Sequence, residues 1–255
     1  SCYYFIAGCT DSLANNYNPF ATINDSTCLY SPFVYGCTDT SALNYNLFAT
    51  LDDSSCCYNS GQLWTQIGLD INGEAIDDNS GFSVSMNSNG NIVAIGAPYN
   101  ADNGHHSGHV RIYEYDGTHW NQLGQDIDGG LINAESGWSV SLSSDGTALA
   151  IGEPGYNHLL GGEGMTRVFI WDGSFWTMLG DSIIGEGSGD QSGWSVSISD
   201  DGQIIAIGAI GNDDNGNNSG HVRIFSFISG SWNQLGNDID GAAFGDKSGY
   251  SVSLS

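Results

Sequence analysis

Short apolar segments separated by turn residues recur along the chain from residue 64 onward. In one unit, residues 82–86 (FSVSM) alternate between apolar and polar, which predicts a half-buried β-strand. Residues 92–97 (IVAIGA) are almost continuously apolar, as in a strand buried on both faces. Residues 109–115 alternate again, and residues 120–127 complete the unit after an Asp-Gly turn. The pattern predicts four antiparallel strands per unit and no helix longer than a turn or two.

The unit repeats with a constant 56-residue period, and no insertion breaks the register. A tryptophan marks one position of each copy: Trp64, Trp120, Trp176 and Trp232. A glycine in the motif Ser-Gly-aromatic-Ser-Val-Ser marks another: Gly81, Gly137, Gly193 and Gly249. Self-similarity at a fixed period of this length is typical of propellers, solenoids and arrays. Because each unit has four antiparallel strands, we predict an all-β fold made of β-propeller-type blades.

Residues 1–58 follow a different plan, with two similar units at positions 8–28 and 36–56. Each begins with GCTD, ends with a cysteine and is too short to bury a core, for which a disulfide is the usual remedy. We predict two disulfides, Cys9–Cys28 and Cys37–Cys56. Each would contribute about 3 kcal/mol by closing its loop. A zinc site is disfavoured because no C-x2-C spacing occurs.

Cys2 and Cys57 are left over by this pairing, and they could bond to each other or to another chain. The sequence around Cys2 is similar to the ends of the two units, so Cys2 could close an earlier unit. The region resembles short Cys/Asp repeats of secreted microbial proteins, of the form GCTD…NYN…AT..D.SC. This resemblance implies secretion and a linker or stalk role. We therefore expect a disulfide-stapled region over residues 1–58 and propeller-like repeats over residues 59–255.

The longer repeats also resemble a known family. Over residues 62–255, the run SG[FWY]SVS…AIGAP…GHVRIY…W.QLG.DI resembles FG-GAP repeats, the blades of integrin-α-like propellers. The resemblance implies an extracellular adhesion or ligand-binding protein, often supported by calcium and rarely catalytic. The calcium loop of that family, D-x-D-x-D-G between the first two strands, is shortened here to SNG, SDG or DDG. That turn alone is too short to surround a calcium ion.

The charge of the chain narrows the choice of partners. It carries 29 acidic and 4 basic residues, for a formal charge of −25. Such a field repels nucleic acid and anionic membranes, so neither is expected as a partner. No apolar run approaches the length of a membrane-spanning helix, so no membrane insertion is expected. The start shows no signal-peptide pattern, and we expect Ser1 to be a processed end or the edge of a fragment. The composition fits an extracellular protein.

Two oxygen-rich patterns recur in the loops. The first, Asn-x-Asp-x-Gly, comprises Asn100, Asp102, Asn212 and Asp214. The second, Asp-Ile-Asp-Gly, comprises Asp126, Asp128, Asp238 and Asp240, with Asp70 and Asn72 as a variant. Oxygens at i and i+2 before a glycine make half a calcium loop, but the same residues are ordinary turn formers. The second copy lacks both patterns, and the first pattern is the preferred Ca²⁺ candidate.

Other recurring side chains have a structural and a functional interpretation. The repeated tryptophans, with Trp138 and Trp194, could stack sugars, but one tryptophan at a fixed place in every blade favours core packing. A recurring arginine occupies positions Arg111, Arg167 and Arg223. We expect it to pair with a carboxylate of the Asp-x-Ser-Gly turn: Asp78, Asp190 or Asp246. Capture of a ligand carboxylate or sulfate is the alternative.

Three histidines, His105, His106 and His109, suggest zinc. The counterparts of the first two are Gly161 and Gly162 in the second copy and Asn217 and Asn218 in the third, so loop variation is the preferred interpretation. No G-x-S-x-G, H-E-x-x-H or phosphate-binding motif occurs, and no enzyme activity is predicted. Sequons at Asn24 and Asn217 are credible glycosylation sites in a secreted protein.

The repeats comprise a lone fourth strand, three full units and a lone first strand. Three blades do not close a typical ring, so we expect further repeats or edges completed by a neighbouring molecule. The main hypothesis is a non-enzymatic extracellular structural or adhesion protein, a subunit of a surface filament that self-associates or binds other extracellular proteins and glycans. The alternative is a calcium-assisted propeller lectin that binds carbohydrate, and a secreted hydrolase is a weaker third.

Overall fold

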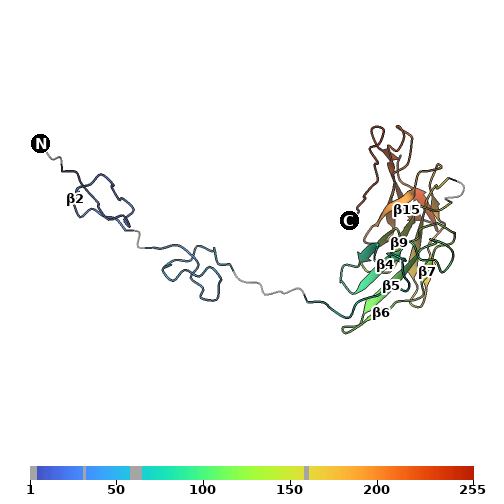
Figure 1. Cartoon of the computed structure of the whole chain (residues 1–255), viewed down its shortest axis with the longest axis horizontal. Coiled ribbons are helices and arrows are strands. Elements are labelled where there is room, and N and C mark those ends of the chain that lie inside the picture. The colour runs from blue at the N-terminus through green and yellow to red at the C-terminus, as the bar shows by residue number, and fades with distance from the viewer. Residues whose placement is uncertain (1–4, 31–32, 58–64, 158–160) are drawn as a thin grey trace. The chain divides into compact units, whose positions relative to one another are not determined.

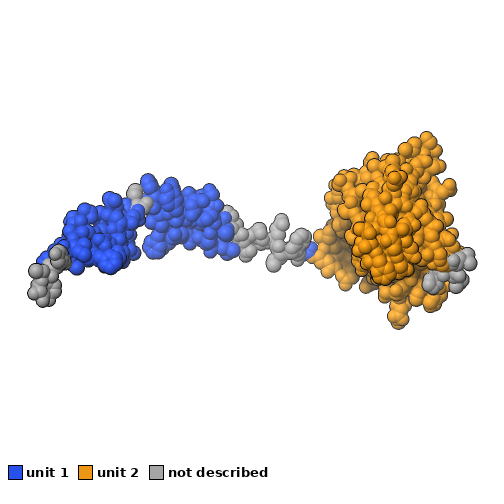
Figure 2. All heavy atoms as spheres, turned by 90° about the horizontal axis from the view of Figure 1, so that it is seen from above, with its two compact units in different colours: residues 1–65 blue, residues 66–255 orange. Residues whose placement is uncertain are grey.

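The computed structural model describes residues 5–30, 33–57, 65–157 and 161–255. The chain forms two compact units, Ser1–Thr65 and Gln66–Ser255, coloured blue and orange in Figure 2. The predicted boundary after residue 58 falls in a stretch outside the described residues. All regular structure in the described ranges is β-strand, as Figure 1 shows. Within these ranges, no helix is long and apolar enough to span a membrane.

The larger unit contains three blades, each an antiparallel sheet of four strands in chain order with a fifth short strand added. The first blade contains β3 (Ser83–Met86), β4 (Ile92–Ala97), β5 (His109–Tyr115), β6 (Trp120–Gln122) and β7 (Ile127–Asp128). The second contains β8 (Ser139–Leu142), β9 (Ala148–Glu153), β10 (Met165–Trp171), β11 (Trp176–Met178) and β12 (Ile183–Ile184). The third contains β13 (Ser192–Ile198), β14 (Ile204–Ala209), β15 (His221–Ile228), β16 (Ser231–Gln234) and β17 (Ile239–Asp240). The predicted all-β, blade-like fold is confirmed.

The fourth strand of each blade differs from the prediction. The pattern over residues 120–127 predicts one strand, but β6 and β7 pair separately with the two ends of β5. Between them, Gly124 has a φ of 81°, and a Cβ atom there would lie 2.6 Å from the ring of Trp171 in the next blade. The same break occurs at Gly236 of the third blade (φ 74°), where a Cβ atom would meet nothing within 4 Å, so the turn does not require a neighbouring blade. The prediction of one continuous strand was wrong.

The repeated serines and glycines hold one blade against the next. Ser83 Oγ donates a hydrogen bond to the carbonyl of Gly137 (2.6 Å), and Ser139 makes the same bond to Gly193 (2.8 Å). The blades approach so closely that a Cβ atom on Gly152 would lie 2.0 Å from the carbonyl oxygen of Gly193. The Ser-Gly motif therefore sets the distance between blades.

Each blade joint also buries an apolar cluster. Between the first two blades this cluster comprises Ala94, Val110, Ile112, Ile127, Leu142, Leu149, Ile151, Phe169 and Trp176. One surface of the first blade is uncovered, and we call its side chains Phe82, Val84 and Met86 the open face. Met86 is 51% exposed, whereas its counterparts Leu142 and Ile198 are 7% and 5% exposed. The open face is thus the same surface that a neighbouring blade covers in the other two copies.

The smaller unit depends on its cysteines. Both predicted disulfides are present, Cys9–Cys28 and Cys37–Cys56. The strands β1 (Ala7–Gly8) and β2 (Ile23–Asn24) pair in parallel beside the first of them. The buried apolar side chains among the described residues of this unit are those of Cys9, Ala14, Cys37 and Ala42, so cross-links replace a core. Cys57 is exposed and has no disulfide within the described part, while Cys2 lies outside it.

Candidate functional site

The predicted calcium residues lie in the loops between the second and third strands of the first and third blades. Asn100 and Asn212 are buried, and their side-chain oxygens accept hydrogen bonds from the backbone N–H groups of Asp102 (3.0 Å) and Asp214 (3.1 Å). These asparagines therefore shape their own turns. The side chains of Asp102 and Asp214 are exposed. Calcium binding by these four residues stays a prediction, and the aspartates are its best-placed members.

In the third blade, Asp214 belongs to a group with Glu186, His221 and Asp238. One ligand atom from each of the four lies within 4.8 Å of those of the others. His221 is the first residue of β15, Glu186 follows β12 and Asp238 precedes β17. The ring of His221 is fully buried, and its Nδ1 lies 3.6 Å from Oδ2 of Asp238. Three separate segments therefore bring carboxylates to one buried histidine.

The first blade carries an equivalent group, formed by Glu74, Asp102 and His109. His109 is the first residue of β5, and its Nδ1 lies 3.7 Å from Oε2 of Glu74. Nδ1 of His109 has no hydrogen-bond partner, and neither ring nitrogen of His221 has one. A buried polar atom without a partner is costly, so these rings are unusual in the fold.

An arginine stands beside each group. Nη1 of Arg111 lies 3.4 Å from Oε1 of Glu74, and Nη1 of Arg223 lies 3.4 Å from Oε1 of Glu186. Nη2 of Arg223 also donates to the carbonyl of Ile184 in the preceding blade (2.8 Å). The arginine thus links each blade to the segment before it.

The predicted arginine partners, Asp78, Asp190 and Asp246, were wrong. These carboxylates instead accept hydrogen bonds from the backbone N–H groups three residues earlier: Ala75, Gly187 and Ala243. The Asp-x-Ser-Gly turn therefore satisfies its own aspartate locally. The arginines pair with glutamates that the sequence pattern did not single out.

The second blade has different residues at the same positions. Gly130, Met165 and Ser182 stand where the third blade has Glu186, His221 and Asp238. The counterpart of Asp214 is His158, which lies outside the described residues. The second blade therefore lacks the histidine and all three carboxylates at these positions.

Arg167 of the second blade takes its carboxylate from Glu153, at the end of β9, where the other blades have Ala97 and Ala209. Glu153 has no exposure to solvent, and its Oε2 has no hydrogen-bond partner. Burial raises the pKa of Glu153 above that of an ordinary glutamate, although Arg167 and Ser136 act in the opposite direction.

The sequence pattern did not predict the histidine–carboxylate groups, because His109 was grouped with its neighbours His105 and His106 and not with its counterpart His221. The structure places His105 Nδ1 3.1 Å from Asn133 Oδ1 and stacks His106 on Tyr99, with ring centroids 4.5 Å apart. A signal was present in the comparison of the copies. Four residues of the first copy recur together in the third copy and are all replaced in the second: Glu74, Asp102, His109 and Asp126.

The repeated tryptophans pack between blades. The indole N–H of Trp176 donates to the carbonyl of Leu123 (2.9 Å), and that of Trp232 donates to Leu179 (2.9 Å). Trp176 is 3% exposed. The favoured core-packing interpretation agrees with this arrangement, while Trp64 lies outside the described residues. A second row of rings crosses the blades in the order Phe82, Trp138, Trp194 and Tyr250, with centroid spacings of 4.6, 4.9 and 5.8 Å.

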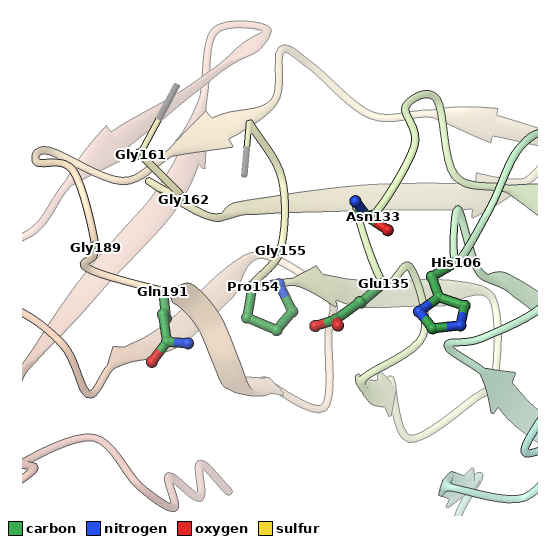
Figure 3. Close-up of a pocket in the computed structure, with 9 residues that line it drawn as sticks. All are labelled: His106, Asn133, Glu135, Pro154, Gly155, Gly161, Gly162, Gly189 and Gln191. Carbon is green, nitrogen blue, oxygen red and sulfur yellow. The ribbon is translucent and has the colours of Figure 1, made fainter. Parts of the chain in front are cut away.

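A polar pocket of about 470 Å³ opens between the loops that follow the second strands and the segments that connect one blade to the next. His106, Asn133, Glu135 and Gln191 line it together with several glycines and Pro154. In the view of Figure 3, Glu135 lies between Pro154 and His106. The sequons remain predictions, and both Asn24 and Asn217 are exposed as an acceptor must be.

One family model matches the chain. Residues 186–225, from Glu186 to Phe225 of the third blade, match the model described as FG-GAP repeat. This stretch is therefore similar to an FG-GAP repeat. The resemblance predicted from the motifs is therefore confirmed for the third copy, and the equivalent stretches of the first and second copies carry the same motifs in the same register. Glu186 of the histidine–carboxylate group is the first residue of the matched stretch, and His221 lies near its end.

Solved structures with similar shape share little sequence with this chain, and no curated protein sequence matches it. Kuenenia stuttgartiensis hydrazine synthase is 11% identical with a TM-score of 0.42, covering 70% of this chain and 41% of its own. Saccharomyces cerevisiae Sqt1 is 16% identical with a TM-score of 0.39, covering 67% and 38%. The Pseudomonas aeruginosa periplasmic gluconolactonase PpgL is 13% identical with a TM-score of 0.36, covering 62% and 56%. At TM-scores below 0.5, these similarities carry no conclusion about activity or partners.

Proposed function

We propose that this protein is a non-enzymatic extracellular structural or adhesion protein whose blades join copies into a filament. The observation that carries the proposal is the open face. Val84 is 59% exposed, whereas its counterpart Val196 is 8% exposed beneath a neighbouring blade. Burial of this apolar surface against a partner would lower the free energy, because it removes the side chains from water.

The opposite end of the blade row exposes the complementary surface. Ile239 is 54% exposed, whereas its counterparts Ile127 and Ile183, which pack at blade joints, are 4% and 6% exposed. Part of this surface is contacted by the chain's own residues 249–255, because Ser195 Oγ donates to the carbonyl of Gly249 and the N–H of Leu254 donates to Ser197 Oγ. A second copy whose first strand replaced this segment would repeat the joint already used twice within the chain. Such head-to-tail contacts generate rings or filaments.

An extracellular location is supported by the two disulfides and by the FG-GAP repeat. The formal charge of −25 opposes association of copies in low salt, because like charges repel. Screening by salt or by divalent cations is therefore expected to promote assembly.

Light scattering and negative-stain electron microscopy of the whole chain test the proposal. We expect concentration-dependent polymers with a regular rise for the wild type, and monomers for Met86→Asp and Ile239→Asp, which put a charge into the contact. Phe175→Ser is the matched control, because Phe175 is 61% exposed in a hairpin turn of the second blade, whereas the two surfaces belong to the first and third. Monomers at every concentration and salt, or polymers that tolerate both aspartates, would exclude this mode of assembly.

The polar pocket favours a second candidate, a carbohydrate-binding propeller lectin. Its amide, carboxylate and imidazole groups are those that bind sugar hydroxyls, and its glycines leave backbone groups accessible. A glycan array is expected to show binding that disappears in the double substitution Asn133→Ala, Gln191→Ala. An array without any bound glycan would leave only the structural role.

A further inference from the structure

We propose that the groups around His221 and His109 are two equivalent sites for a divalent transition-metal ion, with Zn²⁺ as the defining probe. The first site comprises Glu186, Asp214, His221 and Asp238, and the second comprises Glu74, Asp102 and His109. They share Asp102 and Asp214 with the predicted calcium loops, but their glutamate and histidine ligands come from other segments of the chain. The proposal does not depend on filament assembly.

The buried histidine is the observation that points to a metal. Both ring nitrogens of His221 are buried without a hydrogen-bond partner, and Nδ1 faces Oδ2 of Asp238 at 3.6 Å. That separation is too long for a hydrogen bond. It is of the order expected for two atoms that ligate one ion, each about 2.0–2.2 Å from it.

The ligand types select the class of ion. Ca²⁺ prefers six to eight oxygen ligands, whereas Zn²⁺ and its neighbours in the first transition row combine imidazole nitrogen with carboxylate oxygen. Each proposed site offers one imidazole and two or three carboxylates. At His221 the four side chains can supply all ligands of a four-coordinate ion. At His109 the three side chains leave one coordination position for water.

The charges match a divalent ion. At the His221 site, three carboxylates and the guanidinium of Arg223, which lies 3.4 Å from Glu186, sum to −2. At the His109 site, two carboxylates and Arg111 sum to −1. Asp126, the counterpart of Asp238, lies outside that group, although both aspartates accept a hydrogen bond from the glutamine four residues earlier. We therefore expect tighter binding at His221 than at His109.

The second blade supplies an internal control. Where the first and third blades have the glutamate and the histidine, it has Gly130 and Met165, and the counterpart of Asp238 is Ser182. Glu153 then takes over the pairing with the blade arginine. The glutamate, the histidine and the aspartate before the last strand are thus present together in two blades and missing together in one, as expected if they bind one ion.

A metal at these positions would stabilise the blade joint. Glu186 belongs to the segment that leaves the second blade, whereas His221 opens a central strand of the third. An ion shared by the two would hold that connecting segment against β15. Zn²⁺ binding is therefore expected to raise the thermal unfolding temperature of the blade unit.

Isothermal titration of chelator-treated whole chain with Zn²⁺ alone tests the proposal. We expect two ions per chain for the wild type, one for His221→Met and none for the double variant His109→Met, His221→Met. The methionine copies Met165, which the second blade accommodates at this position. As a second route that retains the histidine, Asp238→Ser copies Ser182 and is expected to weaken the tighter site by more than about 100-fold.

The matched control is the double substitution His105→Asn, His106→Asn, which copies Asn217 and Asn218 of the third blade. It removes two histidines outside the sites and is expected to keep both ions and the thermal shift. Millimolar Ca²⁺ is expected not to displace Zn²⁺. Absence of Zn²⁺ binding, a stoichiometry indifferent to the methionine variants, or displacement of the bound Zn²⁺ by millimolar Ca²⁺ would each overturn the proposal.

Discussion

Arg167 donates a hydrogen bond to Glu153, a side chain with no exposure to solvent. In the flanking blades, the arginine pairs instead with a glutamate of the preceding segment, Glu74 or Glu186. The second copy has Gly130 at the position of that glutamate. In the second blade the arginine therefore also has an ion pair, but its carboxylate comes from the neighbouring strand and not from the preceding segment.

Glu153→Ala is expected to destabilise the blade unit by about 3–5 kcal/mol, because it leaves a largely buried arginine without its carboxylate. Urea unfolding followed by tryptophan fluorescence measures this loss. Adding Gly130→Glu is expected to recover much of it, because a Cβ atom at Gly130 meets nothing within 4 Å and the new acid copies Glu74. A double variant no more stable than Glu153→Ala would show that the two arrangements are not interchangeable.

The same carboxyl group is expected to make stability depend on pH. Because burial raises the pKa of Glu153 above its reference value of 4.5, the folded state holds this proton more tightly than the unfolded state does. The resulting stabilisation is fully present below about pH 4.5 and is lost as the pH rises through the folded-state pKa.

Glu153→Gln removes that titration and provides the comparison. Urea midpoints measured across a pH series are expected to show the wild type losing stability relative to the glutamine variant as the pH rises. Parallel curves for the two proteins would mean that Glu153 has the same pKa folded and unfolded.

Gly152→Ala tests the close approach of the blades. The new methyl group would lie 2.0 Å from the carbonyl oxygen of Gly193 and 2.3 Å from Ser139 Oγ, so we expect a loss of at least about 1–3 kcal/mol in thermal or urea unfolding. Gly130→Ala is the control, because its methyl group meets nothing. Equal stability of the two variants would contradict a joint set by the Ser-Gly motif.

Reduction of the disulfides is expected to unfold the smaller unit and leave the blades intact. Each cross-link joins cysteines at a sequence separation of 19 and contributes about 3 kcal/mol, while the blade unit contains no cysteine. Heteronuclear NMR with and without a reductant would show collapse of the resonances of residues 5–57 only. Loss of blade resonances under the same conditions would contradict independent folding of the two units.

The sequence by itself determined the local features of this protein. The constant period of the repeat and the alternation within it predicted three of the four main strands of each blade, because side chains facing the core alternate along a strand. The paired cysteines were equally predictable, since two short units with the same spacing have little else to stabilise them. The resemblance of the motifs to FG-GAP repeats was readable for the same reason.

Only the tertiary structure decided what depends on distant segments meeting. The rings of the next blade approach Gly124 and Gly180 so closely that a Cβ atom would lie 2.6 Å from Trp171 and 2.9 Å from Phe227, which no local pattern shows. The arginines pair with glutamates, while the carboxylates of Asp78 and Asp190 accept hydrogen bonds from the backbone of their own turn. The carboxylates around His221 come from three segments, and only the packing of one blade on the next brings them to its buried ring. The local sequence pattern had therefore assigned His221 to no site.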